Sequence, residues 1–190
     1  VFAYADRLAA DLRKAAYQGS PIIVHVDKRE LRGGEKNWQW IKKGIPLRIE
    51  VGPRDVKNAA AVVYRRDQSV REKMFLSREQ LLSNAALLLD SIQQQYFKQA
   101  KAYRDEHTQY GIANYEEFRS FFTPSNQEKP EIHGGFVVAK WCGDERVSRP
   151  LLEALKVTIR CLPREQSGTK GKCVLTGRDA EIDAIFAKAY

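Results

Sequence analysis

The sequence predicts an α/β protein in which a mixed sheet flanked by helices is followed by a long connecting helix and a small α+β domain. Strand and helix patterns alternate near the start, a helical apolar pattern then continues for about 28 residues, and short strands and helices return beyond it. The chain has 190 residues, and 43% of them are hydrophobic, which is enough to form buried cores. We therefore expect an α/β domain at 1–76, a connecting helix at 77–107 and an α+β domain at 108–190.

The first domain opens with an amphipathic helix, whose apolar residues recur every three or four positions and which ends near Gly19. The β-branched run from Pro21 to Asp27 predicts a buried strand. A polar loop at 29–37 and a short helix ending at Gly44 are expected next. The remaining expected elements are a half-buried strand at 46–51, a turn at 52–55 and strands at 59–66 and 71–76.

Ser77 and Gln80 have the spacing of a capping box, in which each side chain accepts a hydrogen bond from the other residue's backbone N–H. They predict the start of a helix roughly 42 Å long at 1.5 Å per residue. Its apolar face, expected to be buried, consists of Leu81, Leu82, Ala85, Leu88, Leu89, Ile92, Tyr96 and, at the end, Tyr103. Because such a helix is too long for one small core, we expect it to connect two bodies.

The last domain is expected to hold a polar loop at 123–135, which contains two prolines and two glycines. Apolar runs predict strands at 135–139 and 157–161, a helix at 149–155 and a flexible loop at 164–172. Ile182, Ile185 and Phe186 predict a last strand or helix that packs on this domain.

Basic residues exceed acidic ones by eight, and the excess is concentrated in one part of the chain. Between Lys28 and Lys73 there are thirteen basic and six acidic residues, a net charge of +7. This concentration indicates a polyanionic partner, nucleic acid first, with an ordinary basic surface as the alternative. No stretch approaches the roughly 20 apolar residues that a membrane span needs.

The segment from Arg32 to Asp55 interleaves cations with aromatic rings. The cations are Lys36, Lys42, Lys43, Arg48 and Arg54, and the rings are Trp38 and Trp40. Cations contact phosphates, and aromatic faces stack on unpaired bases, which RNA loops present and duplex DNA hides. Two structural alternatives remain: the tryptophans belong to the core or an interface, and Arg48 pairs with Glu50 on one face of a strand.

Motifs along the whole chain resemble one known family. KKGIPLRIEVGPRD at 42–55 is similar to a stretch of the anticodon-binding domain of prolyl-tRNA synthetases. The motifs that look like the C-terminal domain of the eukaryote- and archaeon-like form are WCGD at 141–144, TIRCLP at 158–163, GKC at 171–173 and FAKAY at 186–190. The resemblance implies the class II synthetase anticodon-binding fold and the tRNA-binding, anticodon-recognising C-terminal portion of a proline–tRNA ligase, an aminoacyl-tRNA synthetase of translation.

The family's enzymes activate proline with ATP and Mg and charge tRNA(Pro) in an upstream catalytic domain, whose signature motifs are not found in these 190 residues. The resemblance therefore implies a non-catalytic piece of a longer, cytoplasmic enzyme that forms a homodimer through its catalytic domain. Its partner is tRNA(Pro), and neither membrane nor DNA is expected. The resemblance also implies that the first strand of the anticodon domain lies upstream of Val1. Because the sequence begins with Val1 and not Met, we expect a piece of a longer polypeptide or a processed chain.

By position in the motif, Arg48, Arg54 and Asp55 match family residues that lie at the anticodon. Arginine donates to base edges and aspartate accepts from base amino groups, so these residue types suit base reading. The further residues expected to bind are Trp38 and Gln39 at the anticodon and Lys36, Lys42, Lys43 and Lys57 at phosphates. The family usually has an aromatic residue at the position of Asn37 and Glu at that of Ile41. Either the reading is redistributed, for instance to Gln39, or discrimination is looser.

Family members that carry zinc use two pairs of cysteines, which correspond here to Cys142 with Val147 and to Cys173 with Thr176. Two of the four ligands are therefore lost, and Cys161 lies in a strand motif away from the ligand positions. We expect a degenerate site without zinc and no cofactor in this part of the enzyme. In the family the C-terminal tail reaches toward the catalytic domain, a role that falls here to Tyr190.

A second hypothesis comes from a different functional class. The chain could be a protein- or RNA-interaction module that kept the fold and lost anticodon specificity, with Ile41 and the missing zinc ligands as early signs. A thiol enzyme is disfavoured, because no histidine or acidic residue stands at catalytic spacing from a cysteine. Three cysteines, an odd number, indicate a reducing compartment with free thiols or a remnant metal site.

Overall fold

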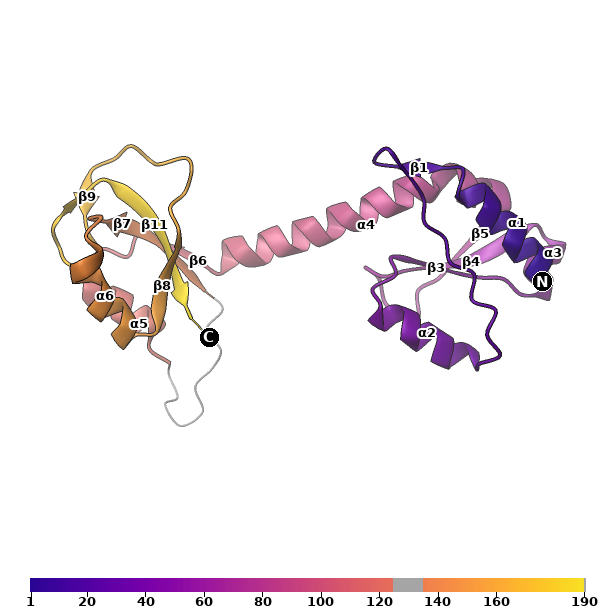
Figure 1. The fold of residues 1–190 in the computed structure, drawn as a ribbon, viewed down its shortest axis with the longest axis horizontal. Helices are drawn as coiled ribbons and strands as arrows, with labels where there is room; N and C mark the ends of the chain where they lie inside the picture. Colours follow the sequence, from indigo (N-terminus) through magenta and orange to yellow (C-terminus); the bar gives the residue numbers. More distant parts are fainter. Residues whose placement is uncertain (125–134, 190) are drawn as a thin grey trace. The chain divides into compact units, whose positions relative to one another are not determined.

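The computed structural model describes residues 1–124 and 135–189 and divides the chain into two units, residues 1–99 and 100–190. The helix α4 (Arg78–Glu106) runs from the first unit into the second (Figure 1). Both units combine helices with a sheet, which confirms the expected α/β class. Among the helices of the described ranges, none has the length and apolarity that a membrane crossing requires.

The first unit contains an antiparallel sheet with the strand order β3-β4-β5. Its elements before α4 are α1 (Phe2–Leu12), β1 (Ala16–Tyr17), β2 (Ser20–Pro21), α2 (Gly33–Lys42), β3 (Leu47–Glu50), α3 (Pro53–Lys57), β4 (Ala60–Arg65) and β5 (Met74–Ser77). Ala61 and Val63 of β4 are buried against Leu8 of α1 and Leu81 of α4. The sheet therefore turns one face, the core face, toward these two helices.

The predicted buried strand at 21–27 is wrong beyond Pro21. The residues that follow β2 pair with no strand of the described chain, and Ile23 is 98% exposed. Ile22 and Val24 are half-buried and pack against the core. The β-branched run is thus covered by the core on one side only. A continuous series of apolar residues does not show whether one side or both sides of a segment are buried.

Two stretches expected as loop and turn are helical. The helix α2 begins at Gly33, inside the expected polar loop, and it is followed by Gly44, whose φ of +77° favours glycine. The expected turn at 52–55 is the start of α3, because Pro53 takes the first helical position and Asp55 Oδ2 accepts a hydrogen bond of 2.7 Å from the N–H of Gly52. Glycine, proline and aspartate are common both in turns and at the first residues of helices, so the composition of 52–55 does not distinguish the two.

The capping box at the start of α4 is confirmed. The N–H of Ser77 donates to Gln80 Oε1 at 2.9 Å, and the N–H of Gln80 donates to Ser77 Oγ at 3.1 Å. The expected apolar face is buried at Leu81, Ala85 and Ile92 and half-buried at Leu82, Leu88 and Leu89. The expected burial of Tyr96 and Tyr103 is wrong, since both are exposed where the apolar stripe continues past the core of the first unit.

The second unit contains a sheet of order β6-β7-β11-β8, in which β6 runs parallel to β7 and the other pairs are antiparallel. Its elements are β6 (Thr108–Tyr110), α5 (Tyr115–Phe122), β7 (Phe136–Trp141), α6 (Glu145–Ala154), β8 (Val157–Cys161), β9 (Gly171–Lys172), β10 (Asp179–Ala180) and β11 (Ile182–Lys188). The expected strands at 135–139 and 157–161 correspond to β7 and β8, and the last apolar run is β11. Residues 125–134 of the expected loop, and Tyr190, lie outside the described residues.

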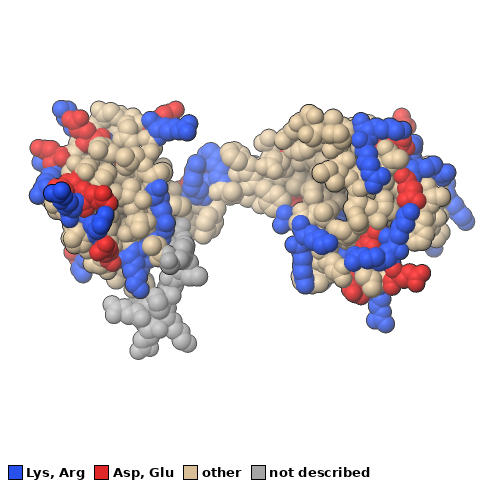
Figure 2. Space-filling model, in the orientation of Figure 1, with Lys and Arg blue, Asp and Glu red and all other residues tan. Residues whose placement is uncertain are grey.

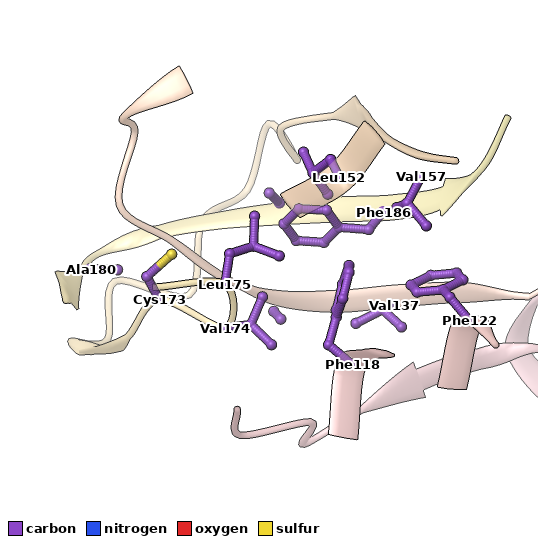
Figure 3. Packing of buried hydrophobic residues seen from close by; sticks show 12 residues of the cluster. Phe118, Phe122, Val137, Leu152, Val157, Cys173, Val174, Leu175, Ala180 and Phe186 are labelled. Atoms are coloured by element: carbon purple, nitrogen blue, oxygen red, sulfur yellow. The ribbon is translucent and has the colours of Figure 1, made fainter. Parts of the chain in front are cut away.

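Three phenylalanines form the centre of the second core (Figure 3). The ring of Phe118 packs edge-on against those of Phe122 and Phe186, with centroids 4.9 and 5.2 Å apart. The helix α6 begins earlier than expected because Asp144 caps it, accepting hydrogen bonds from the N–H groups of Arg146 and Val147. The aspartate of the WCGD motif therefore serves the fold of this unit.

Candidate nucleic-acid interface

The face of the β3-β4-β5 sheet opposite the core face carries polar and aromatic side chains, and we call it the outer face. Because successive residues of a strand point to opposite faces, Arg48 and Glu50 of β3 lie on the outer face. Tyr64 is paired directly with Arg48, and Val62 with Glu50. The helix α2 reaches this face through Asn37, whose Nδ2 donates to Glu50 Oε1 at 2.9 Å.

The guanidinium of Arg48 lies in a confined place on the outer face. Its carbon Cζ stands 4.5 Å from the ring centroid of Tyr64, and its Nε lies 3.7 Å from Glu50 Oε1, an ion-pair distance too long for a hydrogen bond. The side chain is only 16% exposed, and its buried Nε has no hydrogen-bond partner in the described chain. The expected alternative, pairing with Glu50, is therefore present and leaves Arg48 unsatisfied as a donor.

The surroundings of Tyr64 also act on its hydroxyl. Burial raises the pKa of Tyr64, and the charge of Glu50 together with a hydrogen bond to that carboxylate raises it further, while the charge of Arg48 opposes the effect. Tyr64 is thus a neutral phenol at physiological pH. It offers Arg48 an uncharged aromatic face, a suitable support for a guanidinium.

The helix α2 is fixed to the preceding segment by a cluster around Asp27. Its carboxylate accepts the Nε1–H of Trp40 at 2.8 Å and a two-pronged contact from Arg29, at 2.9 Å from Nε and 2.7 Å from Nη2. The hydrogen bond from Arg29 holds the pKa of the Asp27 carboxyl well below its usual range, with burial opposing and Trp40 assisting. Trp40 therefore helps to hold α2 against the segment before it.

The other predicted residues of α2 differ in how much freedom they keep. Trp38 is 58% exposed, with Lys42 Nζ 5.3 Å from its ring centroid, while Lys43 Nζ lies 4.5 Å from the ring of Trp40. Gln39 Oε1 accepts a hydrogen bond of 2.8 Å from Arg29 Nη1. Of this group, Trp38 presents the largest open aromatic surface, whereas the amide of Gln39 is already engaged.

The residues of α3 stand apart from the cluster around Arg48. The side chains of Arg54 and Lys57 are exposed and form no hydrogen bond or ion pair with any described residue, and neither does the side chain of Lys36 of α2. Asp55 caps α3 with one carboxylate oxygen. The structure therefore links α2 to β3 through Asn37 and Glu50, and it places Arg54, Asp55 and Lys57 directly after β3. Lys and Arg side chains are spread over the visible face of this unit (Figure 2).

Sequence reasoning missed Asn37, Tyr64 and the Asp27–Arg29 pair as parts of this surface. Two of these residues could have been identified from the sequence. Asn37 stands where the family usually has an aromatic residue, and Tyr64 lies in an expected strand that can pair with the strand of Arg48. The side-chain bonds of Asp27 with Arg29 and Trp40 join positions up to 13 residues apart, which no short motif reveals.

Three of the four positions of the lost zinc site, Cys142, Cys173 and Thr176, lie close together in the second unit. Thr176 Oγ1 is 3.7 Å from Cys142 Sγ. Burial raises the pKa of the Cys173 thiol, but hydrogen bonds from Thr176 and from backbone N–H groups outweigh it, so that the pKa is lowered overall. No group of three or more metal-ligating side chains is found within residues 1–124 and 135–189. The present donors fit zinc poorly, because Val147 supplies no ligand atom.

Comparisons with known proteins agree with this division of the chain. A family model described as "Anticodon binding domain" matches residues 1–85, and one described as "Prolyl-tRNA synthetase, C-terminal" matches residues 127–190. The proline–tRNA ligase of Protochlamydia amoebophila is 59% identical over the whole chain, and that of Thermococcus kodakarensis is 36% identical. A crystal structure of prolyl-tRNA synthetase from Cryptosporidium parvum, complexed with L-proline and AMP, superposes with a TM-score of 0.79 at 26% identity.

The first unit is therefore an anticodon-binding domain of the aminoacyl-tRNA synthetase class. The chain belongs with the prolyl-tRNA synthetases and corresponds to their anticodon-binding and C-terminal regions. It is fully covered by the three proteins named above and spans 37% of the length of each.

Proposed function

We propose that this chain binds the anticodon loop of tRNA(Pro) and that Arg48, Arg54 and Asp55 contact the anticodon bases. The observation that supports this most is the state of Arg48: its guanidinium is half-buried, stacked on Tyr64 and without a hydrogen bond in the described chain. Because no N–H group of this guanidinium is used within the described chain, the remaining N–H groups can donate to the carbonyl and ring-nitrogen acceptors of a base edge. Trp38 and Gln39, which follow Asn37 on α2, are proposed as further anticodon contacts.

Phosphate contacts are proposed for Lys36, Lys42, Lys43 and Lys57. None of these lysines forms an ion pair within the described residues, so each can offer its charge to RNA. The rings of Trp38 and Trp40 lie beneath Lys42 and Lys43 and restrict where the ammonium groups stand. Such contacts add affinity without base preference and make binding depend on salt.

For the whole protein we propose the activity of a proline–tRNA ligase. The relatives' names support it, together with the match of both regions to this family. In that reaction proline is activated with ATP and Mg and transferred to tRNA(Pro) in a catalytic domain upstream of the present residues, in a cytoplasmic homodimer. Tyr190 would then extend toward that domain.

Filter binding with the anticodon stem-loop of tRNA(Pro) and with loops carrying substituted anticodon bases tests the base-reading role. Replacing Arg54 with Ala should weaken cognate binding by about 1–3 kcal/mol and reduce the preference over the substituted loops. Replacing Lys43 with Ala should weaken all loops alike and lower the salt slope by about one. Unchanged affinity and preference in both Arg48→Ala and Arg54→Ala would instead favour the interaction-module hypothesis.

A further inference from the structure

The outer face continues past Tyr64 onto β5, where it carries a large exposed aromatic ring. The register pairs Val62 with both Glu50 and Phe75, so that these three residues form one row across the three strands. Phe75 alternates with Met74 and Leu76, which pack on the core face. It therefore points to the outer face, beside the row that contains Arg48 and Tyr64.

Phe75 is 67% exposed although it lies within a sheet strand. The hydrogen bond from α2 to this face goes to Glu50, at the β3 side. Strands are about 4.8 Å apart, so β5 lies roughly 10 Å from β3. Phe75 is thus an uncovered part of the same surface on which Arg48 lies.

The charges around Phe75 favour an anionic ligand. Lys73 Nζ stands 5.2 Å from the centroid of the Phe75 ring. In the hairpin between β4 and β5, Arg65 is paired with Asp67 at 2.7 Å, which neutralises both. The other charged residues between β4 and β5 are Arg66, Arg71, Glu72 and Lys73, an excess of two positive charges.

A single exposed phenylalanine is ordinary, and Phe97 of α4 is an example at 63%. Phe75 differs because it is continuous with the Arg48–Tyr64 pair and has a lysine over its ring. We propose that Phe75 is a further RNA-binding position, which stacks on one unpaired base of the loop that Arg48 contacts, while Lys73 meets its phosphate. This proposal rests on the RNA-binding function proposed above and extends the site across the sheet to β5.

Stacking on an exposed ring predicts a particular binding profile. Every base has an aromatic face, so Phe75 contributes affinity with little preference among bases. Duplex RNA keeps its bases stacked and paired, so it gains nothing from this ring. A protein partner would use the ring as an apolar anchor instead, without distinguishing looped from paired RNA.

The test compares Phe75→Leu, Phe75→Tyr and the matched control Phe97→Leu in the full chain, with an RNA hairpin that carries the anticodon loop and with its fully paired counterpart. Phe75→Leu should weaken loop binding by about 5- to 150-fold, while Phe75→Tyr and Phe97→Leu stay near wild type. Affinity for the duplex and the salt slope for the loop should not change. A fluorescent 2-aminopurine placed in the loop should lose its quenching on binding only in Phe75→Leu.

The outcomes separate this proposal from the one on which it rests. Loop binding that falls in Arg48→Ala but not in Phe75→Leu would overturn the role of Phe75 and leave the anticodon site standing. Equal weakening for loop and duplex in Phe75→Leu would also overturn it, since that pattern indicates a structural effect. Insensitivity to both substitutions would overturn both proposals, and the exposed ring would then be assigned to a protein contact.

Discussion

The indole Nε1 of Trp40 donates a hydrogen bond of 2.8 Å to Oδ2 of Asp27, and this bond ties α2 to the extended segment before it. Trp38, two residues away on the same helix, is largely exposed and forms no hydrogen bond through its indole in the described chain. The two tryptophans of the basic segment therefore divide two tasks. One holds the helix in place, and the other is open to a ligand.

This division predicts opposite phenotypes for matched substitutions. Trp40→Phe removes a hydrogen bond and should lower the free energy of unfolding by about 1 kcal/mol, whereas Trp38→Phe should change it by less than about 0.5 kcal/mol. Urea unfolding followed by circular dichroism measures both values. Equal stability of the two variants would contradict the structural role of Trp40.

The Arg65–Asp67 pair predicts a pH-dependent contribution to stability. The hydrogen bond from Arg65 lowers the pKa of Asp67, so the folded state binds this proton less readily than the unfolded state does. Asp67→Asn should cost about 1.5–3 kcal/mol at pH 7. The difference from wild type should shrink as the pH falls below about 4, the ordinary carboxyl pKa, and vanish below the lowered folded pKa.

Chemical denaturation at a series of pH values follows this difference. Asp105→Asn is the control, because Asp105 forms exposed ion pairs with Lys101 and Arg104, and exposed pairs contribute little to stability. A penalty for Asp67→Asn that stays constant down to pH 2 would rule out the ion pair as its source.

The capping box of α4 predicts a local effect on stability. Ser77→Ala leaves the N–H of Gln80 without its acceptor and should cost about 1 kcal/mol. Ser83→Ala is the control, since the Ser83 hydroxyl donates to the carbonyl oxygen of Gln80 and accepts from Asn84 Nδ2 in the same helix, and it caps no backbone N–H. Hydrogen exchange should show faster opening of the first turn of α4 in Ser77→Ala alone. Identical exchange in both variants would argue against the cap.

The three cysteines should react at different rates with a thiol reagent such as DTNB. Cys161 is exposed, Cys142 is partly covered and Cys173 is buried, so the fastest phase should belong to Cys161. Although the pKa of Cys173 is lowered, this thiol should still react slowly with DTNB, because the residue is buried in the folded state. Cys161→Ser should remove the fast phase, and denaturant should make the remaining thiols react together.

Purified protein should contain far less than one zinc ion per chain by X-ray fluorescence. The site retains two thiols, and Thr176 beside Cys142 supplies only a weak hydroxyl ligand. Restoring the pattern with Val147→Cys and Thr176→Cys together should create stoichiometric zinc binding. Full zinc occupancy in the unmodified protein would overturn the prediction of a degenerate site.

Sequence patterns located the elements whose signals are local. The capping box of Ser77 and Gln80, the glycine after α2 and the alternating strand at 46–51 all depend on neighbours within a few residues. The partial burial of Ile22 and the full exposure of Ile23, like the exposure of Tyr96, depend instead on where the core ends in space. Periodicity contains no information about that boundary.

The candidate site divides in the same way. Motif similarity pointed to Arg48 and the α3 residues, and alternation along β3 pointed to the Arg48–Glu50 pair. The ring of Tyr64 beneath Arg48 and the open ring of Phe75 follow from strand register, which short-range spacing does not determine. Pairing between strands therefore places Tyr64 and Phe75 on the same surface as Arg48, and the motif at 42–55 contains neither of them.

The extended residues after β2 have a consequence for handling the isolated chain. A β-branched run with Ile23 turned to solvent, and no strand beside it in the described residues, is a template for strand addition by another molecule. The net charge of +7 between Lys28 and Lys73 opposes such self-association by mutual repulsion between chains. Because salt screens that repulsion, we expect the chain to aggregate more readily at high ionic strength, the same condition that weakens its hold on RNA.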